Sequence, residues 1–104
     1  TREIGDRRGE GNALGNLGNA CLQLGDARRA IGYYEQRLVI AREIGDMQGE
    51  ANASFNTAIL YRQQGDTARA LELAQHALAL FQKMSSPHAK NAEQLIAAIR
   101  SGKK

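Results

Sequence analysis

The chain repeats itself within its 104 residues. The pentapeptide Arg-Glu-Ile-Gly-Asp at residues 2–6 returns unchanged at 42–46, and Asn12 and Asn52 continue the correspondence at the same 40-residue spacing. Such a period is the sequence signature of a repeat architecture, in which each unit buries its apolar face only by stacking on a neighbour. An array of stacked units is therefore the first expectation for the fold.

A shorter spacing divides each unit in two. The dipeptide Gly-Asp occurs at 5–6, 25–26, 45–46 and 65–66. Glycine adopts the left-handed conformation that ends a helix, and aspartate accepts hydrogen bonds from the free amides that begin the next one. Each dipeptide therefore predicts a tight turn between helices of roughly 18 residues. Ser86 and Pro87 supply an N-cap and a first-turn proline for a shorter last helix near 87–100.

The segments between these turns carry apolar residues at steps of three and four, which is one stripe of an amphipathic helix. No alternating strand pattern competes with this reading. The predicted stripes are Leu14, Leu17, Gly18, Cys21 and Leu24; Ala27, Ala30, Ile31, Tyr34, Leu38 and Ala41; Ala51, Phe55, Ala58, Ile59 and Tyr61; Ala70, Leu71, Ala74, Ala77, Leu78 and Phe81; and Ala92, Leu95, Ile96 and Ile99.

The composition limits the partners to expect. Fourteen Lys and Arg against eleven Asp and Glu give a net charge of +3, too small to favour nucleic acid. No apolar run approaches the roughly 20 residues of a membrane span. The single cysteine forms no internal disulfide framework and fits a reducing compartment. We therefore expect a cytoplasmic protein that binds neither nucleic acid nor membrane.

Several positions resemble the tetratricopeptide repeat. In the first unit these are Leu17-Gly18-Asn19-Ala20, Gly25-Asp26, Ala30-Ile31, Tyr34 and Leu38; in the second they are Ala58, Tyr61, Gly65-Asp66, Ala70-Leu71, Ala74 and Ala77-Leu78. The usual period is 34, and the 40-residue period here resembles the arrays of kinesin light chain and of the Leu-Gly-Asn repeat protein. The chain departs from the family pattern at Arg37, where alanine is usual, and at Arg42 and Gln82, which replace a proline. The resemblance implies an all-α, right-handed α-solenoid of antiparallel helix pairs.

The same resemblance implies a division of the chain. Residues 1–5 would end a preceding helix, 6–45 and 46–85 would be two repeats, and 86–104 would be a capping helix and tail. A single repeat domain cut from a longer array is expected, in which the last helix covers one end of the solenoid. The other end would leave apolar residues of the first helix uncovered.

Asparagine is the residue type that local stability does not explain, because it lowers helix propensity relative to alanine. Asn12, Asn16 and Asn19 lie one turn apart, and Asn52 and Asn56 repeat the first two. By resemblance these positions face the concave groove, where Lys90 and Gln94 of the last helix would extend the row. Amides offer both donors and an acceptor, which suits the backbone of an extended peptide. Hydrogen bonds between repeats are the alternative use of these side chains.

Phe55 and Ile59 are also expected to face the groove. They would form a small apolar pocket for a ligand side chain, or else pack against the last helix near Ala97. Some tetratricopeptide domains clamp a terminal carboxylate with Lys and Asn. Asn19, Asn56 and Lys90 match three positions of that clamp, but Gly15 and Gln94 stand where it has basic residues.

Catalytic chemistry is not indicated. His76 and His88 are read as solvated, without a carboxylate or cysteine cluster at metal-ligand spacing. Cys21 occupies a core position, and the glycines at 9–18 lie inside a helical pattern rather than after a strand. We therefore expect no enzyme, cofactor or metal, but a scaffold or adaptor that binds a protein or peptide in its groove. The alternative is self-association through the open N-terminal end, giving a weak homo-oligomer or an extended superhelix.

Overall fold

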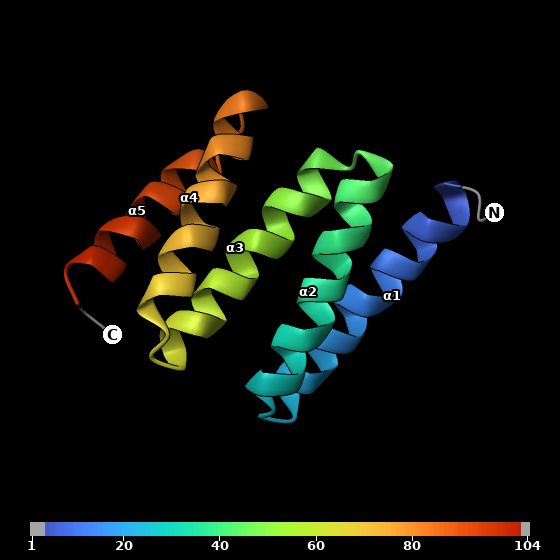
Figure 1. Ribbon diagram of the computed structural model, residues 1–104, viewed down its shortest axis with the longest axis horizontal. Coiled ribbons are helices and arrows are strands. Elements are labelled where there is room, and N and C mark those ends of the chain that lie inside the picture. The colour runs from blue at the N-terminus through green and yellow to red at the C-terminus, as the bar shows by residue number, and fades with distance from the viewer. Residues whose placement is uncertain (1–3, 103–104) are drawn as a thin grey trace.

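The structure, a computed structural model, describes residues 4–102, and this part of the chain contains five α-helices and no strand. They are α1 (Ile4–Gln23), α2 (Ala27–Ile44), α3 (Met47–Gln63), α4 (Thr67–Lys83) and α5 (Ala89–Arg100). Each helix packs mainly against the helices before and after it in the sequence, as Figure 1 shows. The molecule measures 45 × 34 × 19 Å. The predicted all-α solenoid of helix pairs is confirmed.

Three of the four Gly-Asp dipeptides form the predicted turns. Gly45 ends α2 with a φ of 71°, and Asp46 Oδ1 accepts a 2.9 Å hydrogen bond from the Gly49 N–H at the start of α3. The same arrangement recurs at 25–26 and 65–66, where the glycines have φ of 81° and 85°. Local capping chemistry therefore fixes the positions of these three turns.

The first Gly-Asp dipeptide behaves differently, and the prediction of a turn there is wrong. Ile4, Gly5 and Asp6 form the first turn of α1, which continues without interruption to Gln23. Asp6 lies in this first turn, where a negative charge suits the positive end of the helix dipole. Residues 1–3, expected to belong to a preceding helix, lie outside the described residues.

The start of α5 also differs from the sequence reading. The prediction of Ser86 as N-cap is wrong: its Oγ accepts a 3.2 Å hydrogen bond from the His88 N–H within the turn, and the N-cap position is His88, which makes no side-chain cap hydrogen bond. Pro87 and His88 remain in the turn, and the helix begins at Ala89 rather than near residue 87. The proline therefore belongs to the connection and not to the first turn of α5.

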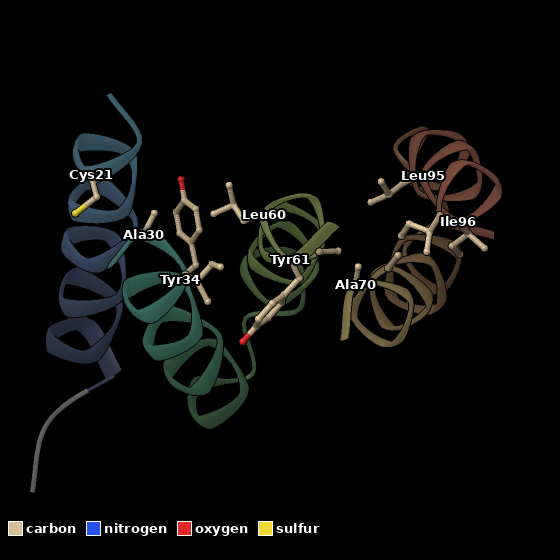
Figure 2. Packing of buried hydrophobic residues seen from close by; sticks show 12 residues of the cluster. Cys21, Ala30, Tyr34, Leu60, Tyr61, Ala70, Leu95 and Ile96 are labelled. Atoms are coloured by element: carbon tan, nitrogen blue, oxygen red, sulfur yellow. The ribbon is translucent and has the colours of Figure 1, made fainter. Parts of the chain in front are cut away.

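Small residues let the helices approach closely. Ala30, Ala58, Ala70 and Ala77 are each fully buried, as expected from their spacing. Larger side chains fill the remaining space, and Figure 2 shows Tyr34 of α2 lying beside Leu60 of α3 within one buried cluster. The predicted α5 stripe of Ala92, Leu95, Ile96 and Ile99 is buried against the preceding helices, which confirms its orientation.

The apolar stripe of α1 was predicted incorrectly at two positions. Leu17 is 46% exposed and Leu24 is 85% exposed, whereas Gly11, Gly18 and Cys21 are buried. In the second repeat the residue that corresponds to Leu17 is Thr57, which is fully buried. The physical reason is the neighbour: α3 has α2 before it to cover this face, and no helix of the described residues covers the same face of α1.

Candidate functional site

A polar groove with a volume of about 450 Å³ runs between α1 and α3, with α2 at its base. Both repeats contribute to it. The residues that line this asparagine groove are Asn12, Gly15, Asn16 and Asn19 of α1; Tyr34 and Arg37 of α2; and Asn52, Ala53 and Asn56 of α3.

The five asparagines singled out in the sequence all meet in this groove. They come from equivalent faces of α1 and α3, and all five are exposed. Of these five side chains, only that of Asn19 makes a hydrogen bond to another side chain of the described residues. The other four make no hydrogen bond that would join the repeats within this part of the chain, so their donors and acceptors are available to a ligand in the groove.

Asn19 is held by a tyrosine from the next helix. The Tyr34 hydroxyl donates to Asn19 Oδ1, and burial raises the pKa of Tyr34 above its usual value of 10.0. The phenol therefore stays protonated as a donor at neutral pH. Because the amide oxygen of Asn19 is engaged, its NH₂ group is the part available to the groove.

The position of the Tyr34 ring depends on a glycine. A Cβ atom added at Gly18 would lie 2.6 Å from Tyr34 Cε1 and 2.8 Å from Cδ1, well inside van der Waals contact. The ring therefore lies directly against the backbone of α1, and the absence of a side chain at Gly18 makes this contact possible. The family resemblance implied a close helix approach at Gly18, and the structure shows which group occupies the space.

The groove continues into a more apolar hollow of about 350 Å³. Asn19, Tyr34 and Asn56 line both parts, and the residues that line only this apolar end are Leu22, Ile59, Leu60 and Gln63. Ile59 therefore lines the groove, as the prediction of an apolar pocket for a ligand side chain expected. Leu22 and Leu60 were not among the candidates.

Phe55 follows the packing alternative, because it packs on buried clusters that include Ala92 and Leu95 of α5 as well as Phe81 of α4. It is half-buried and meets Phe81 of α4 edge to face, with ring centroids 6.4 Å apart. Its ring belongs to the core, so it does not line the groove.

Lys90 and Gln94 do not extend the asparagine row. Both are exposed on α5, and neither lines the groove. The reason is the placement of α5, which packs chiefly on α4 at the far end of the molecule from α1 (Figure 1). The clamp-like set of Asn19, Asn56 and Lys90 is therefore not assembled.

His76 lies in a polar cluster rather than in solvent, so its sequence reading is wrong. Its Nε2 is 2.6 Å from Glu50 Oε2, which also accepts a 2.9 Å hydrogen bond from Arg42 Nε. Burial acts to raise the pKa of Glu50, but the hydrogen bonds from Arg42 and His76 outweigh it, and the pKa lies below its usual value of 4.5. These three side chains join α2, α3 and α4.

Among residues 4–102, no three His, Cys, Asp or Glu side chains lie close enough together to hold a metal ion. Nor does any helix in that range combine the length and the apolar character that crossing a membrane requires. Cys21 is buried in the core between α1 and α2.

The model of the tetratricopeptide repeat family matches residues 10–83, which span most of α1 and all of α2, α3 and α4. The chain belongs to the tetratricopeptide repeat family. No curated protein matches it. Tetratricopeptide repeats generally mediate protein–protein interaction and are typically non-catalytic.

Arg37 is the charged groove residue of this tetratricopeptide domain that the sequence analysis does not predict. In the sequence it stands out only as a departure from the family pattern, although two signals point to the groove. Arg37 follows Tyr34 by one helical turn and so shares its face of α2. Glycines at positions 15 and 49 also leave space for a long side chain on the adjacent helices.

Proposed function

We propose that this tetratricopeptide domain binds an extended peptide segment of a partner protein in the asparagine groove. The observation that carries the proposal is the convergence of five asparagines from two repeats on one groove, four of them without a hydrogen-bond partner in the described residues. Amide side chains pair with backbone N–H and C=O groups of any peptide sequence. The apolar end adds space for one apolar side chain of the ligand.

The energetic argument favours contact with a ligand over a structural role. Asparagine is among the weaker helix formers, and Asn12, Asn16, Asn52 and Asn56 form no hydrogen bond within the described residues that would offset the lower helix propensity. A position that weakens its own helix without a bond in the folded chain is expected to act when a partner is bound.

Removal of two groove amides tests the proposal. Peptides selected from a displayed random library on the wild-type domain should bind Asn16→Ala/Asn56→Ala about 30-fold more weakly, since each lost hydrogen bond contributes about 1 kcal/mol. The melting temperature should stay the same or rise, because alanine is the better helix former. Asn91→Ala is the matched control, an exposed asparagine on α5 outside the groove. A sharp fall in melting temperature for the double variant would show that the amides are structural, and failure to select any peptide would defeat the proposal.

A second candidate function is self-association through the outer face of α1. Ala13, Leu17 and Ala20 are all exposed there, on a different face from the groove asparagines, and Leu24 is exposed in the turn just after the helix. The second repeat indicates what the α1 face is suited to contact, because Ala53, Thr57 and Leu60 of α3, which correspond to Ala13, Leu17 and Ala20, are buried where α3 packs on α2. We propose that a second copy of the chain covers it, with the two α1 helices packed against each other.

Sedimentation over a range of concentrations tests this second candidate. The wild-type mass should rise with concentration, and Leu17→Glu/Leu24→Glu should remain monomeric. Val39→Glu is the control, since Val39 is 51% exposed on α2. A wild-type chain that stays monomeric at millimolar concentration would refute self-association and leave the groove proposal untouched.

A further inference from the structure

Arg37 gives the asparagine groove a charge. The other eight residues that line this part of the groove are neutral, and Arg37 is the one cation among them. It comes from α2 at the base of the groove, and its side chain is 20% exposed. A partly desolvated guanidinium attracts an anion more strongly than one at the open surface.

The chain makes room for this side chain on both sides. A Cβ atom at Gly15 of α1 would lie 3.2 Å from Arg37 Cδ and 3.3 Å from Nε. One at Gly49 of α3 would lie 2.7 Å from Arg37 Nη1. Arg37 therefore extends from α2 between two helix backbones that carry no side chains at the points of contact.

The positive charge at this end of the groove is only partly neutralised. The nearest carboxylate is Asp46, whose Oδ2 lies 4.0 Å from Arg37 Nη2, at the limit of an ion pair. The same Oδ2 lies 3.4 Å from Arg8 Nη1, and Oδ1 caps α3 through the Gly49 N–H. One carboxylate thus serves two guanidinium groups and a helix N-terminus, which leaves a net positive charge beside the groove.

We infer that the groove selects peptides with an acidic side chain, whose carboxylate is held by Arg37 and by the NH₂ groups of the asparagines around it. The inference rests on the proposed peptide binding and adds the chemical class of the ligand. Guanidinium pairs with carboxylate through two parallel hydrogen bonds, which are stronger than neutral ones. The neighbouring amides supply donors for the remaining carboxylate lone pairs.

The two parts of the groove also set a spacing within the ligand. On α3 the polar part is lined by residues 52–56 and the apolar end by residues 56–63. Their centres are roughly five residues apart, or about 8 Å at the rise of an α-helix. An extended peptide rises about 3.3 Å per residue, and alternate side chains point the same way. Arg37 Nη1 lies beside Gly49, about one turn before residue 52, so the ligand should carry its acidic and apolar side chains at least two positions apart.

Peptide selection provides the test. A displayed random library is selected on the wild-type domain and on Arg37→Gln, with Arg28→Gln as the control. Arg28 is exposed on the same helix and does not line the groove, so the control has the same net charge as the test variant. Wild-type and Arg28→Gln should enrich Asp or Glu at least two positions from an apolar residue. Arg37→Gln should still select peptides, but without the acidic residue.

The affinity of one selected peptide for each variant of the domain then isolates the contact between Arg37 and the acidic side chain. The peptide is synthesised with blocked termini, and its acidic residue is replaced by the amide of the same shape. This replacement should weaken binding to the wild type about 10- to 100-fold and leave binding to Arg37→Gln almost unchanged. Arg37→Lys should recover part of the preference for the acidic peptide, since lysine keeps the positive charge but lacks the planar guanidinium that forms two parallel hydrogen bonds with a carboxylate. If Arg37→Gln fails to fold, the peptide replacement measured on the wild type still decides the outcome.

The outcomes separate this inference from the proposed function. Peptides that bind the wild type with no acidic preference would overturn the role of Arg37 and leave peptide binding standing. An acidic preference that persists in Arg37→Gln would overturn it as well. If no peptide is selected by any variant, both proposals fail together.

Discussion

The contact between Gly18 and Tyr34 leads to a quantitative prediction. A methyl group at position 18 would lie 2.6 Å from a ring carbon of Tyr34, about 1 Å inside normal contact. The ring is only 4% exposed and its hydroxyl is bound to Asn19, so it has little freedom to move away. Overpacking of a core costs about 1–3 kcal/mol, and this site belongs in the upper part of that range.

Gly18→Ala also brings a gain, because alanine is favoured over glycine by about 1 kcal/mol inside a helix. The net expectation is a loss of about 1–2 kcal/mol of unfolding free energy. Gly9→Ala in the same helix is the matched control, since nothing lies within 4 Å of its Cβ position. That variant should be more stable by up to about 1 kcal/mol. The two alanine variants of α1 should therefore differ by about 2–3 kcal/mol.

Urea denaturation of the wild type and both variants measures this difference. The Tyr34→Leu background provides a further check, because the shorter side chain does not reach Gly18 with a ring, and Gly18→Ala should then become neutral or stabilising. If Gly18→Ala stabilises the domain as much as Gly9→Ala does, the ring does not rest on the α1 backbone and the argument for the base of the groove is wrong.

Three further predictions concern the core and its polar contacts. Ser54 Oγ is fully buried without a hydrogen-bond partner in the described residues, so Ser54→Ala should raise the unfolding free energy by about 1 kcal/mol in urea denaturation, and unchanged or lower stability would contradict this. The lowered pKa of Glu50 means that its stabilising contribution is present above the usual value of 4.5 and is lost as pH falls through the lower, folded-state value. Glu50→Gln should therefore be less stable than wild type at neutral pH, and the difference should shrink as the pH falls below the usual pKa of 4.5; a difference that stays constant as the pH falls would refute the reasoning. Ala70→Leu should cost about 1–3 kcal/mol because the site is fully buried, while Ala68→Leu on the exposed face of α4 should change the melting temperature little; equal melting temperatures for the two would contradict the packing of α4.

The sequence by itself determined the features that depend on a few neighbouring residues or on the repeat. The turns at 25–26, 45–46 and 65–66 could be predicted because a positive φ at glycine and a side-chain cap from aspartate are local chemistry. The buried residues of α5 could be predicted because their spacing places all four on one face of the helix, and that apolar face is the one that packs on the preceding helices. The asparagines could be grouped because the repeat transfers one helix face onto the next.

Only the tertiary structure decided which faces are covered and which side chains meet across helices. Leu17 matches the fully buried Thr57 in the repeat, yet it is exposed because burial depends on whether a helix lies alongside. Lys90 fits the asparagine pattern but lies on α5, which packs on α4 beyond the groove. Arg37 enters the groove because the bare backbones of two other helices leave space for it. The spacing of residues determines on which face of its own helix a side chain lies. The surroundings of that side chain depend on which other helices pack against that face.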